Sequence, residues 1–92
     1  MILIPYILQK RREPLDPIIN QLLDALEKIN AGAGDYNYVI TSLLLGYIEF
    51  HGQRYEHFNT VHGILDCVGK EFYRRFTAPY EDDAKTRNGD VT

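Results

Sequence analysis

The side chains best suited to bind a ligand gather near residue 75. Residues 71–76, Glu-Phe-Tyr-Arg-Arg-Phe, place two guanidinium groups, three aromatic rings and one carboxylate within about two helical turns. A Pro-Tyr-Glu segment follows at residues 79–81. A guanidinium is a planar fork that fits phosphate or carboxylate, and a tyrosine ring can stack on a nucleobase or donate a hydrogen bond. We therefore predict an anion-binding site, and its candidate residues are Tyr73, Arg74, Arg75 and Tyr80.

The two arginines also have a purely structural interpretation. Cations near the C-terminal end of a helix complement its negative end. Glu71 or Glu81 could hold the arginines in an internal salt bridge. Adjacent residues on a helix point about 100° apart, so one arginine can face the core while the other faces solvent. The sequence leaves both interpretations open.

A second candidate segment is Tyr36-Asn37-Tyr38, at the start of a predicted helix. The first backbone N–H groups of a helix have no partner within it, and they attract anions and polar ligand edges. We predict that Asn37 and Tyr38 contribute to ligand binding. The alternative is that Asn37 only satisfies the free N–H groups as an N-cap.

Histidines and acids give weaker grounds for an enzyme. His57 and His62 are five positions apart, whereas metal ligands that share a helical face are three or four apart. We predict no metal site and no cofactor. His62 and Asp66 have the i,i+4 spacing of a helical pair. A small metal-dependent hydrolase that uses this pair, or the acidic tail, is one functional hypothesis. The sequence has no phosphate-binding glycine loop and no recognised nucleophile motif.

Length and composition limit the class of protein. The chain has 92 residues, a net charge of −3 and one cysteine, Cys67. We expect a single domain without an internal disulfide. We expect no general binding of nucleic acid, because such surfaces are basic. The apolar N-terminus is too short for a signal peptide or a membrane span. We therefore predict a cytoplasmic protein without a membrane partner. It would belong to a host cell or to a virus within one.

Apolar residues at three- and four-residue steps predict three helices, at residues 15–30, 36–50 and 55–77. Asp16 and Pro17 suit the cap and the first position of the first helix. The segment Asn30-Ala31-Gly32 is expected to end it, because glycine tolerates the left-handed conformation that often follows a helix.

The remaining boundaries follow from caps and prolines. Asp35 is the expected N-cap of the second helix, and Pro79 is expected to end the third. Residues 1–13 are expected to form an extended arm, which lies on the helices or pairs with another copy. Residues 80–92 are polar and are expected to form a tail, disordered on composition alone.

The predicted fold class is all-α. Short loops between helices of four to six turns favour a three-helix up-down-up antiparallel bundle. The third helix carries a heptad-type seam, made of Phe58, Val61, Leu65, Val68 and Phe72. A chain this short buries a thin core, so we predict a homo-oligomer in which a second apolar helix face meets another copy.

Three motifs occur in order along the chain: Gly34-Asp35-Tyr36-Asn37-Tyr38-Val39-Ile40-Thr41, then Glu71-Phe72-Tyr73-Arg74-Arg75 with Pro79-Tyr80-Glu81, then Asn88-Gly89-Asp90-Val91. In these motifs the chain resembles a family of small phage and bacterial proteins that is known as a domain of unknown function. The family pattern has a leucine before the Asn-Tyr pair and a final tyrosine, where this chain has Tyr36 and Thr92. The resemblance implies a bacterial host cell, and it implies that the polar motifs meet, with the tail ordered over Tyr73 and Arg74.

Three functions follow as hypotheses. The first is a non-enzymatic homo-oligomer that binds an anionic small molecule, with a nucleotide as the leading class, in a pocket between subunits. By analogy with small helical phage proteins, it would sequester an immune signal. The second is a protein-interaction module, such as a viral inhibitor of a host enzyme. The third is the metal-dependent hydrolase.

Overall fold

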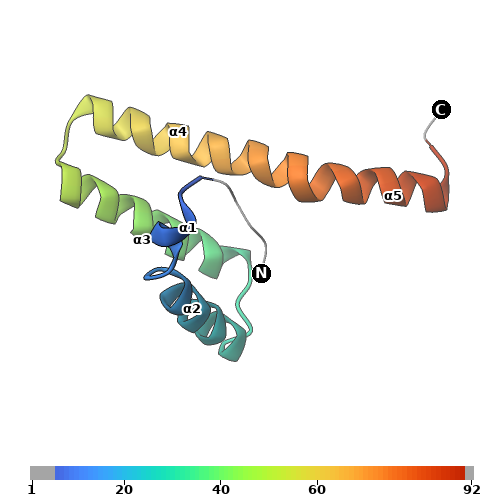
Figure 1. Cartoon of the computed structure of the whole chain (residues 1–92), viewed down its shortest axis with the longest axis horizontal. Coiled ribbons are helices and arrows are strands. Elements are labelled where there is room, and N and C mark those ends of the chain that lie inside the picture. Colours follow the sequence, from blue (N-terminus) through green and yellow to red (C-terminus); the bar gives the residue numbers. More distant parts are fainter. Residues whose placement is uncertain (1–5, 91–92) are drawn as a thin grey trace. The chain divides into compact units, whose positions relative to one another are not determined.

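The computed structural model describes residues 6–90, and regular secondary structure in that range is entirely helical (Figure 1). The helices are α1 (Gln9–Arg12), α2 (Asp16–Lys28), α3 (Ala33–His51), α4 (Tyr55–Phe72), the π-helical segment η1 (Tyr73–Thr77) and α5 (Ala78–Asn88). The all-α prediction is therefore confirmed for this part of the chain. Within the same residues, no helix combines the length and apolar character that a membrane span requires.

The chain divides into two compact units, Met1–Ser42 and Leu43–Thr92, and the division falls inside α3. The first unit contains α1, α2 and the first part of α3. The second contains the last part of α3 together with α4, η1 and α5. The three-helix up-down-up arrangement stays a prediction.

In the first unit, α2 ends in a complete Schellman motif. Asn30 takes the left-handed conformation, with φ of 52°, so the residue that ends this helix is Asn30 and not Gly32. The N–H of Asn30 donates to the carbonyl of Glu27 at 3.0 Å, and the N–H of Ala31 donates to the carbonyl of Leu26 at 2.9 Å. Asparagine adopts this backbone conformation more readily than most residues because its short polar side chain can form hydrogen bonds with nearby backbone groups.

Helix α3 begins at Ala33, three residues before the predicted start. Gly32 is the residue before the helix, and its N–H donates to the Asp35 carboxylate at 3.0 Å. Asp35 is therefore not the N-cap; it is the third helical residue and forms the acidic half of a capping box. At α2, Asp16 likewise lies inside the first turn, and no side chain caps that helix.

The predicted extended arm is partly wrong. Residues Gln9–Arg12 form the short helix α1. The Arg12 guanidinium donates to the carbonyl of Ile7 through Nε at 3.1 Å and Nη2 at 2.9 Å, which folds this segment back on itself. The beginning of the arm, residues 1–5, lies outside the described residues.

In the second unit, the end of α3 and the start of α4 form a helical hairpin (Figure 1). Gly52 makes the turn with φ of 105°, a conformation that favours glycine. His57 Nδ1 lies 2.8 Å from the Gly52 carbonyl oxygen, and the His57 ring meets the edge of Tyr47 at 6.4 Å between centroids. Beside them Ile48 is buried, so this turn contains the small core of the unit.

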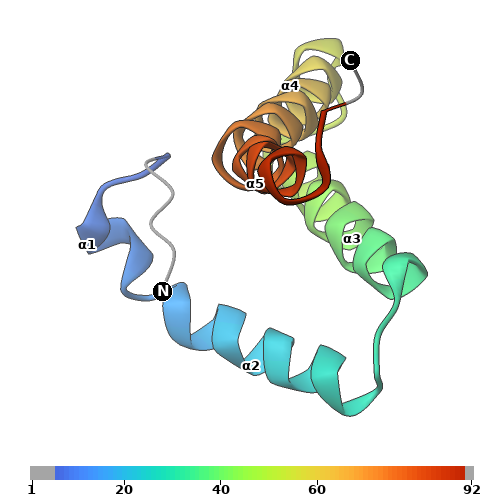
Figure 2. The same ribbon diagram turned by 90° about the vertical axis from the view of Figure 1, so that its right-hand side faces the viewer.

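Pro79 does not end the third helix, contrary to the prediction. Figure 2 looks nearly along α4 and α5 and shows one following the other, joined by η1. The N–H of Ala78 donates to the carbonyl of Tyr73, five residues back, so the chain has one wider turn just before the proline. A proline ring clashes with the carbonyl four residues earlier in an α-helix, and the wider turn moves that carbonyl away. The predicted tail is accordingly helical as far as Asn88.

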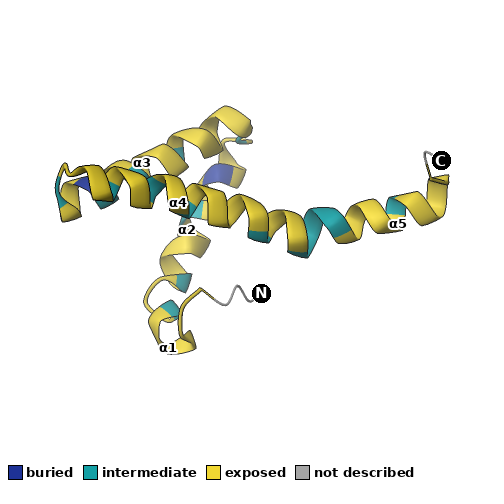
Figure 3. Ribbon diagram, turned by 90° about the horizontal axis from the view of Figure 1, so that it is seen from above, coloured by how far each residue is buried: buried dark blue, intermediate teal, exposed yellow. Residues whose placement is uncertain are grey.

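Burial among residues 6–90 is slight, as Figure 3 shows by colour. The buried apolar side chains there are Leu26 and Ile48, each 6 % exposed. Helix α2 is strongly amphipathic, yet Ile18 and Ile19 in its apolar stripe are exposed. The apolar stripes seen in the sequence therefore exist as helix faces, and many of their side chains are exposed.

Candidate anion-binding site

The π-helical segment η1 contains the two arginines of the predicted site. A π turn is rare and appears mainly as a single wide turn inside an α-helix, often at functional sites. Here the cause is local, because Pro79 follows two residues after the segment ends. The proline thus sets the backbone geometry of Tyr73, Arg74 and Arg75.

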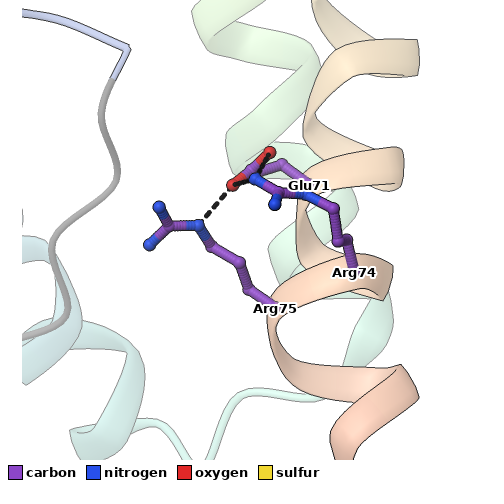
Figure 4. Close-up of polar contacts among 3 residues, drawn as sticks. All are labelled: Glu71, Arg74 and Arg75. Atoms are coloured by element: carbon purple, nitrogen blue, oxygen red, sulfur yellow. Dashed lines mark hydrogen bonds and ion pairs between the residues drawn. The ribbon is translucent and has the colours of Figure 1, made fainter.

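One carboxylate, that of Glu71, lies between the two guanidinium groups (Figure 4). Arg74 Nη2 donates to both oxygens of Glu71, at 2.8 Å to Oε1 and 3.0 Å to Oε2. Arg75 Nε donates to the same Oε1. The spacings are i,i+3 and i,i+4, which place side chains together on a helix surface. The internal salt bridge that the sequence left open is therefore formed.

The cluster keeps a positive charge, because two guanidinium groups share one carboxylate. Glu71 has only 19 % of its side chain exposed, whereas Arg74 is 70 % exposed and Arg75 is 33 % exposed. The hydrogen bond from Arg74 lowers the pKa of Glu71 below its ordinary value of 4.5, partial desolvation opposes this shift, and Arg75 adds to it. Glu71 is thus a firmly ionised partner, and Arg74 is the cation that faces solvent.

Tyr73 connects the site to α5. Its hydroxyl forms a hydrogen bond with the Glu81 carboxylate, which raises the pKa of Tyr73 above its ordinary value. Tyr73 also lines a shallow depression of about 380 Å³ together with Leu65, Asp66, Gly69 and Lys70. The depression is open and mostly apolar, so it suits a flat ring more than a deeply enclosed ligand.

Tyr80, the other tyrosine of the predicted site, lies on α5. The Arg87 guanidinium lies over its ring, 6.0 Å from the centroid, and Arg87 Nε also lies 3.2 Å from Asp83 Oδ2. Tyr80 is therefore part of a local network along α5. Its predicted role at the ligand stays untested.

Asn37 and Tyr38 lie inside α3, past its first turn. The free N–H groups at the start of that helix belong to earlier residues, so Tyr36-Asn37-Tyr38 does not open the helix as predicted, and the N-cap alternative for Asn37 is also wrong. Both residues belong to the unit Met1–Ser42, whereas the arginines belong to Leu43–Thr92. That all of these residues meet at one ligand stays a prediction.

A family model matches residues 4–91, almost the whole chain. The chain belongs to the Domain of unknown function family DUF6899. This agrees with the resemblance to an uncharacterised family seen in the sequence. Comparison with curated proteins and with solved structures found no match.

Lys70 is the residue of this DUF6899 chain that sequence reasoning missed. Its Nζ lies 2.8 Å from Asp66 Oδ2, and the hydrogen bond with Asp66 raises the pKa of Lys70 above its ordinary value of 10.5. The i,i+4 spacing of Asp66 and Lys70 could have revealed the pair, but His62 has the same spacing from Asp66 on the other side and was the predicted partner. Lys70 adds a cation beside Tyr73 on the wall of the depression.

Proposed function

We propose that this protein is a non-enzymatic homo-oligomer that binds an anionic small molecule, with a nucleotide as the leading class. The supporting observation is the cluster of Glu71, Arg74 and Arg75, in which two guanidinium groups share one carboxylate. An incoming phosphate carries more charge than the carboxylate and accepts more hydrogen bonds, so it can compete for the exposed Arg74.

A shallow depression on another side of α4 offers a surface for the ring of a nucleotide. Tyr73 lines the depression, where a ring can stack on its phenol, and Lys70, which pairs there with Asp66 at 2.8 Å, adds an ammonium group that a phosphate would have to share with that carboxylate. In the proposed oligomer, neighbouring copies complete the helical bundle and close the open side of this depression. A cytoplasmic phage protein of this kind would sequester a nucleotide signal without converting it.

The test is a thermal-shift panel of mono-, di- and cyclic nucleotides on the wild-type protein and on Arg74→Ala. We expect a nucleotide to raise the wild-type melting temperature and to have little effect on Arg74→Ala, because the solvent-facing fork is gone. Arg54→Ala is the matched control: Arg54 is 73 % exposed and pairs with Glu56 at 3.4 Å, much as Arg74 pairs with Glu71. If no nucleotide changed the melting temperature of the wild-type protein, the ligand proposal would be refuted.

A second variant, which is expected to raise the affinity for a nucleotide, tests the same proposal. Glu71→Gln removes the carboxylate that competes with the ligand, so the affinity for a nucleotide should rise by about two- to fivefold, the range expected for an exposed ion pair. Glu56→Gln, which removes the partner of Arg54, should leave the affinity unchanged. Equal affinities for Glu71→Gln and wild type would indicate that the ligand does not contact the arginine cluster.

A protein-interaction module is the second candidate. It is favoured by the acidic residues 81–83 near the start of α5, which could present negative charge to a basic partner. That function predicts a partner whose binding is indifferent to nucleotides. The hydrolase hypothesis gains no support, since Asp66 is held by Lys70 at 2.8 Å.

A further inference from the structure

Helix α4 has an uncovered apolar strip along one side. We define the α4 strip as Phe58, Leu65, Val68, Gly69 and Phe72. The exposed fractions are 46 % for Phe58, 43 % for Leu65, 49 % for Val68 and 59 % for Phe72. With about 200 Å² for a phenylalanine, the two rings alone expose roughly 200 Å², and the aliphatic side chains bring the strip to the size of the largest apolar patch on a typical monomer, about 300–600 Å², which is often functional.

The hairpin within the second unit uses a neighbouring side of α4. His57, Val61 and Ile64 are half-buried there, and the His57 ring lies 5.7 Å from that of His51. Leu65 is one residue beyond Ile64, about 100° further around the helix. Phe58, Leu65 and Gly69 therefore lie beside the hairpin contact, whereas Val68 is about 40° around the helix from Ile64 and is exposed one turn further along α4.

The strip has the symmetry of a contact between identical helices. Phe58 and Phe72 are each seven residues from Leu65, and Val61 and Gly69 are each four residues from it. When two identical helices pack antiparallel with Leu65 at the centre, residues equally far from Leu65 in opposite directions come to the same level. Each Phe58 then meets a Phe72, and each Val61 lies level with a Gly69.

We propose that two copies of the chain pack antiparallel along the α4 strip, with Leu65 of both copies on the two-fold axis. A two-fold contact requires a surface that complements itself, and Phe58, Leu65 and Phe72 meet that requirement, while Val68 and Gly69 come level with the partner's His62 and the partner's Val61. Glu56 and Arg74 are nine residues to either side of Leu65, about 180° around the helix, so both stay in solvent. A partner of different sequence would need no such symmetry.

The pairing also adds a residue to the proposed ligand site. Tyr73 is eight residues beyond Leu65, and Tyr55 is ten residues before it, on the same side of the helix within about 10°. In the antiparallel pair, the partner's Tyr55 therefore lies about 3 Å along the axis from the level of Tyr73. Tyr55 is 82 % exposed in the single chain. This inference rests on the homo-oligomer of the proposed function, but not on the identity of the ligand.

The decisive experiment is disulfide trapping in a Cys67→Ser background. Helices that pack about 8–10 Å apart bring facing Cα atoms on the axis to about 4–5 Å, within the range a disulfide spans. Leu65→Cys should therefore form a covalent dimer rapidly on mild oxidation. Gly63→Cys is the matched control, because position 63 lies about 160° around the helix from Leu65. Equal trapping at both positions, or none at Leu65→Cys, would overturn the proposal.

Glycine variants give an independent readout without cysteine chemistry. A Cβ at Gly63 or at Gly69 meets nothing within 4 Å in the single chain, so alanine at either position is sterically free there. In the antiparallel pair, Gly69 faces the other copy. Gly69→Ala should raise the dimer dissociation constant about tenfold or more, while Gly63→Ala leaves it unchanged, as measured by sedimentation. A native mass equal to the single-chain 10.7 kDa would contradict the pairing, whatever the nucleotide panel shows.

Discussion

At the scale of the residue, the central observation is that Glu71 holds both arginines of the η1 segment. The pair of cations is therefore preorganised by an acid on the preceding turn, which keeps the guanidinium groups from repelling each other. A ligand anion must displace or share this carboxylate. Under the proposed function, the affinity for the anion would depend on this competition, and the comparison of wild type with Glu71→Gln measures it.

The lowered pKa of Glu71 predicts a specific loss of stability in acid. The carboxylate contributes fully above its unfolded-state pKa of about 4.5 and loses its contribution as the pH falls through the lower folded-state pKa. Urea unfolding followed by circular dichroism from pH 7 to pH 3 should therefore show a larger loss for wild type than for Glu71→Gln. Parallel losses in the two proteins would mean that the salt bridge contributes nothing to folding.

At the scale of the element, the π-helical turn explains how a helix continues through Pro79. The missing N–H of proline and the bulk of its ring are accommodated because the hydrogen bonds just before it span five residues. The extra residue in that turn changes the direction in which α5 presents its side chains. The hydrogen bond between Tyr73 and Glu81 spans this turn.

Pro79→Ala should stabilise the helix and weaken the site. Alanine restores an N–H and has a higher helix propensity, so the melting temperature should rise, by the equivalent of about 1 kcal/mol. A relaxed α-helical turn would rotate α5 by about 100° relative to Tyr73, which separates Tyr73 from Glu81. Nucleotide affinity should then fall, as measured in the thermal-shift assay.

The control for this variant is Pro14→Ala, at a proline outside the regular helices. It should give neither the gain in stability nor the loss of affinity. If Pro79→Ala lowered the melting temperature, the proline would be a stabilising part of the turn, and the account of η1 as an accommodation of Pro79 would be wrong.

At the scale of the whole molecule, the main fact is how little apolar surface one chain covers among residues 6–90. Leu26 and Ile48 are buried, while aromatic residues such as Phe50, at 85 % exposure, stand in solvent. Helix α3 is apolar on most of its sides, which is typical of a helix surrounded by others. Both observations favour an assembly of several copies.

The melting temperature should therefore depend on protein concentration. Association stabilises the folded chain by mass action, so a hundredfold increase in concentration should raise the melting temperature of a dimer by roughly 5–10 °C. Circular dichroism melts across that range measure the effect. A melting temperature that stays constant would show that each chain folds independently of other copies.

Local patterns in the sequence were enough to predict most of the helical positions. The stripe of α2, the turn at Gly52 and the start of α4 at Tyr55 follow from periodicity and from residues that favour turns. The salt bridge of Glu71 with the arginines was one of the two interpretations that the sequence allowed, because residues at i,i+3 and i,i+4 spacing share a helix face. These features depend on residues within about one or two turns of each other, so the sequence alone specifies them.

Other features were decided only by the folded backbone. Whether Pro79 ends a helix depends on which hydrogen bonds the preceding turn adopts, and the helix continued because η1 rearranged them. Asn30 took the left-handed position in place of Gly32 because the Schellman bonds formed one turn earlier. The small core at Ile48 likewise required the chain to reverse at Gly52. Sequence periodicity determines which faces are apolar, whereas burial depends on what packs against each face, and that is a property of three-dimensional contacts.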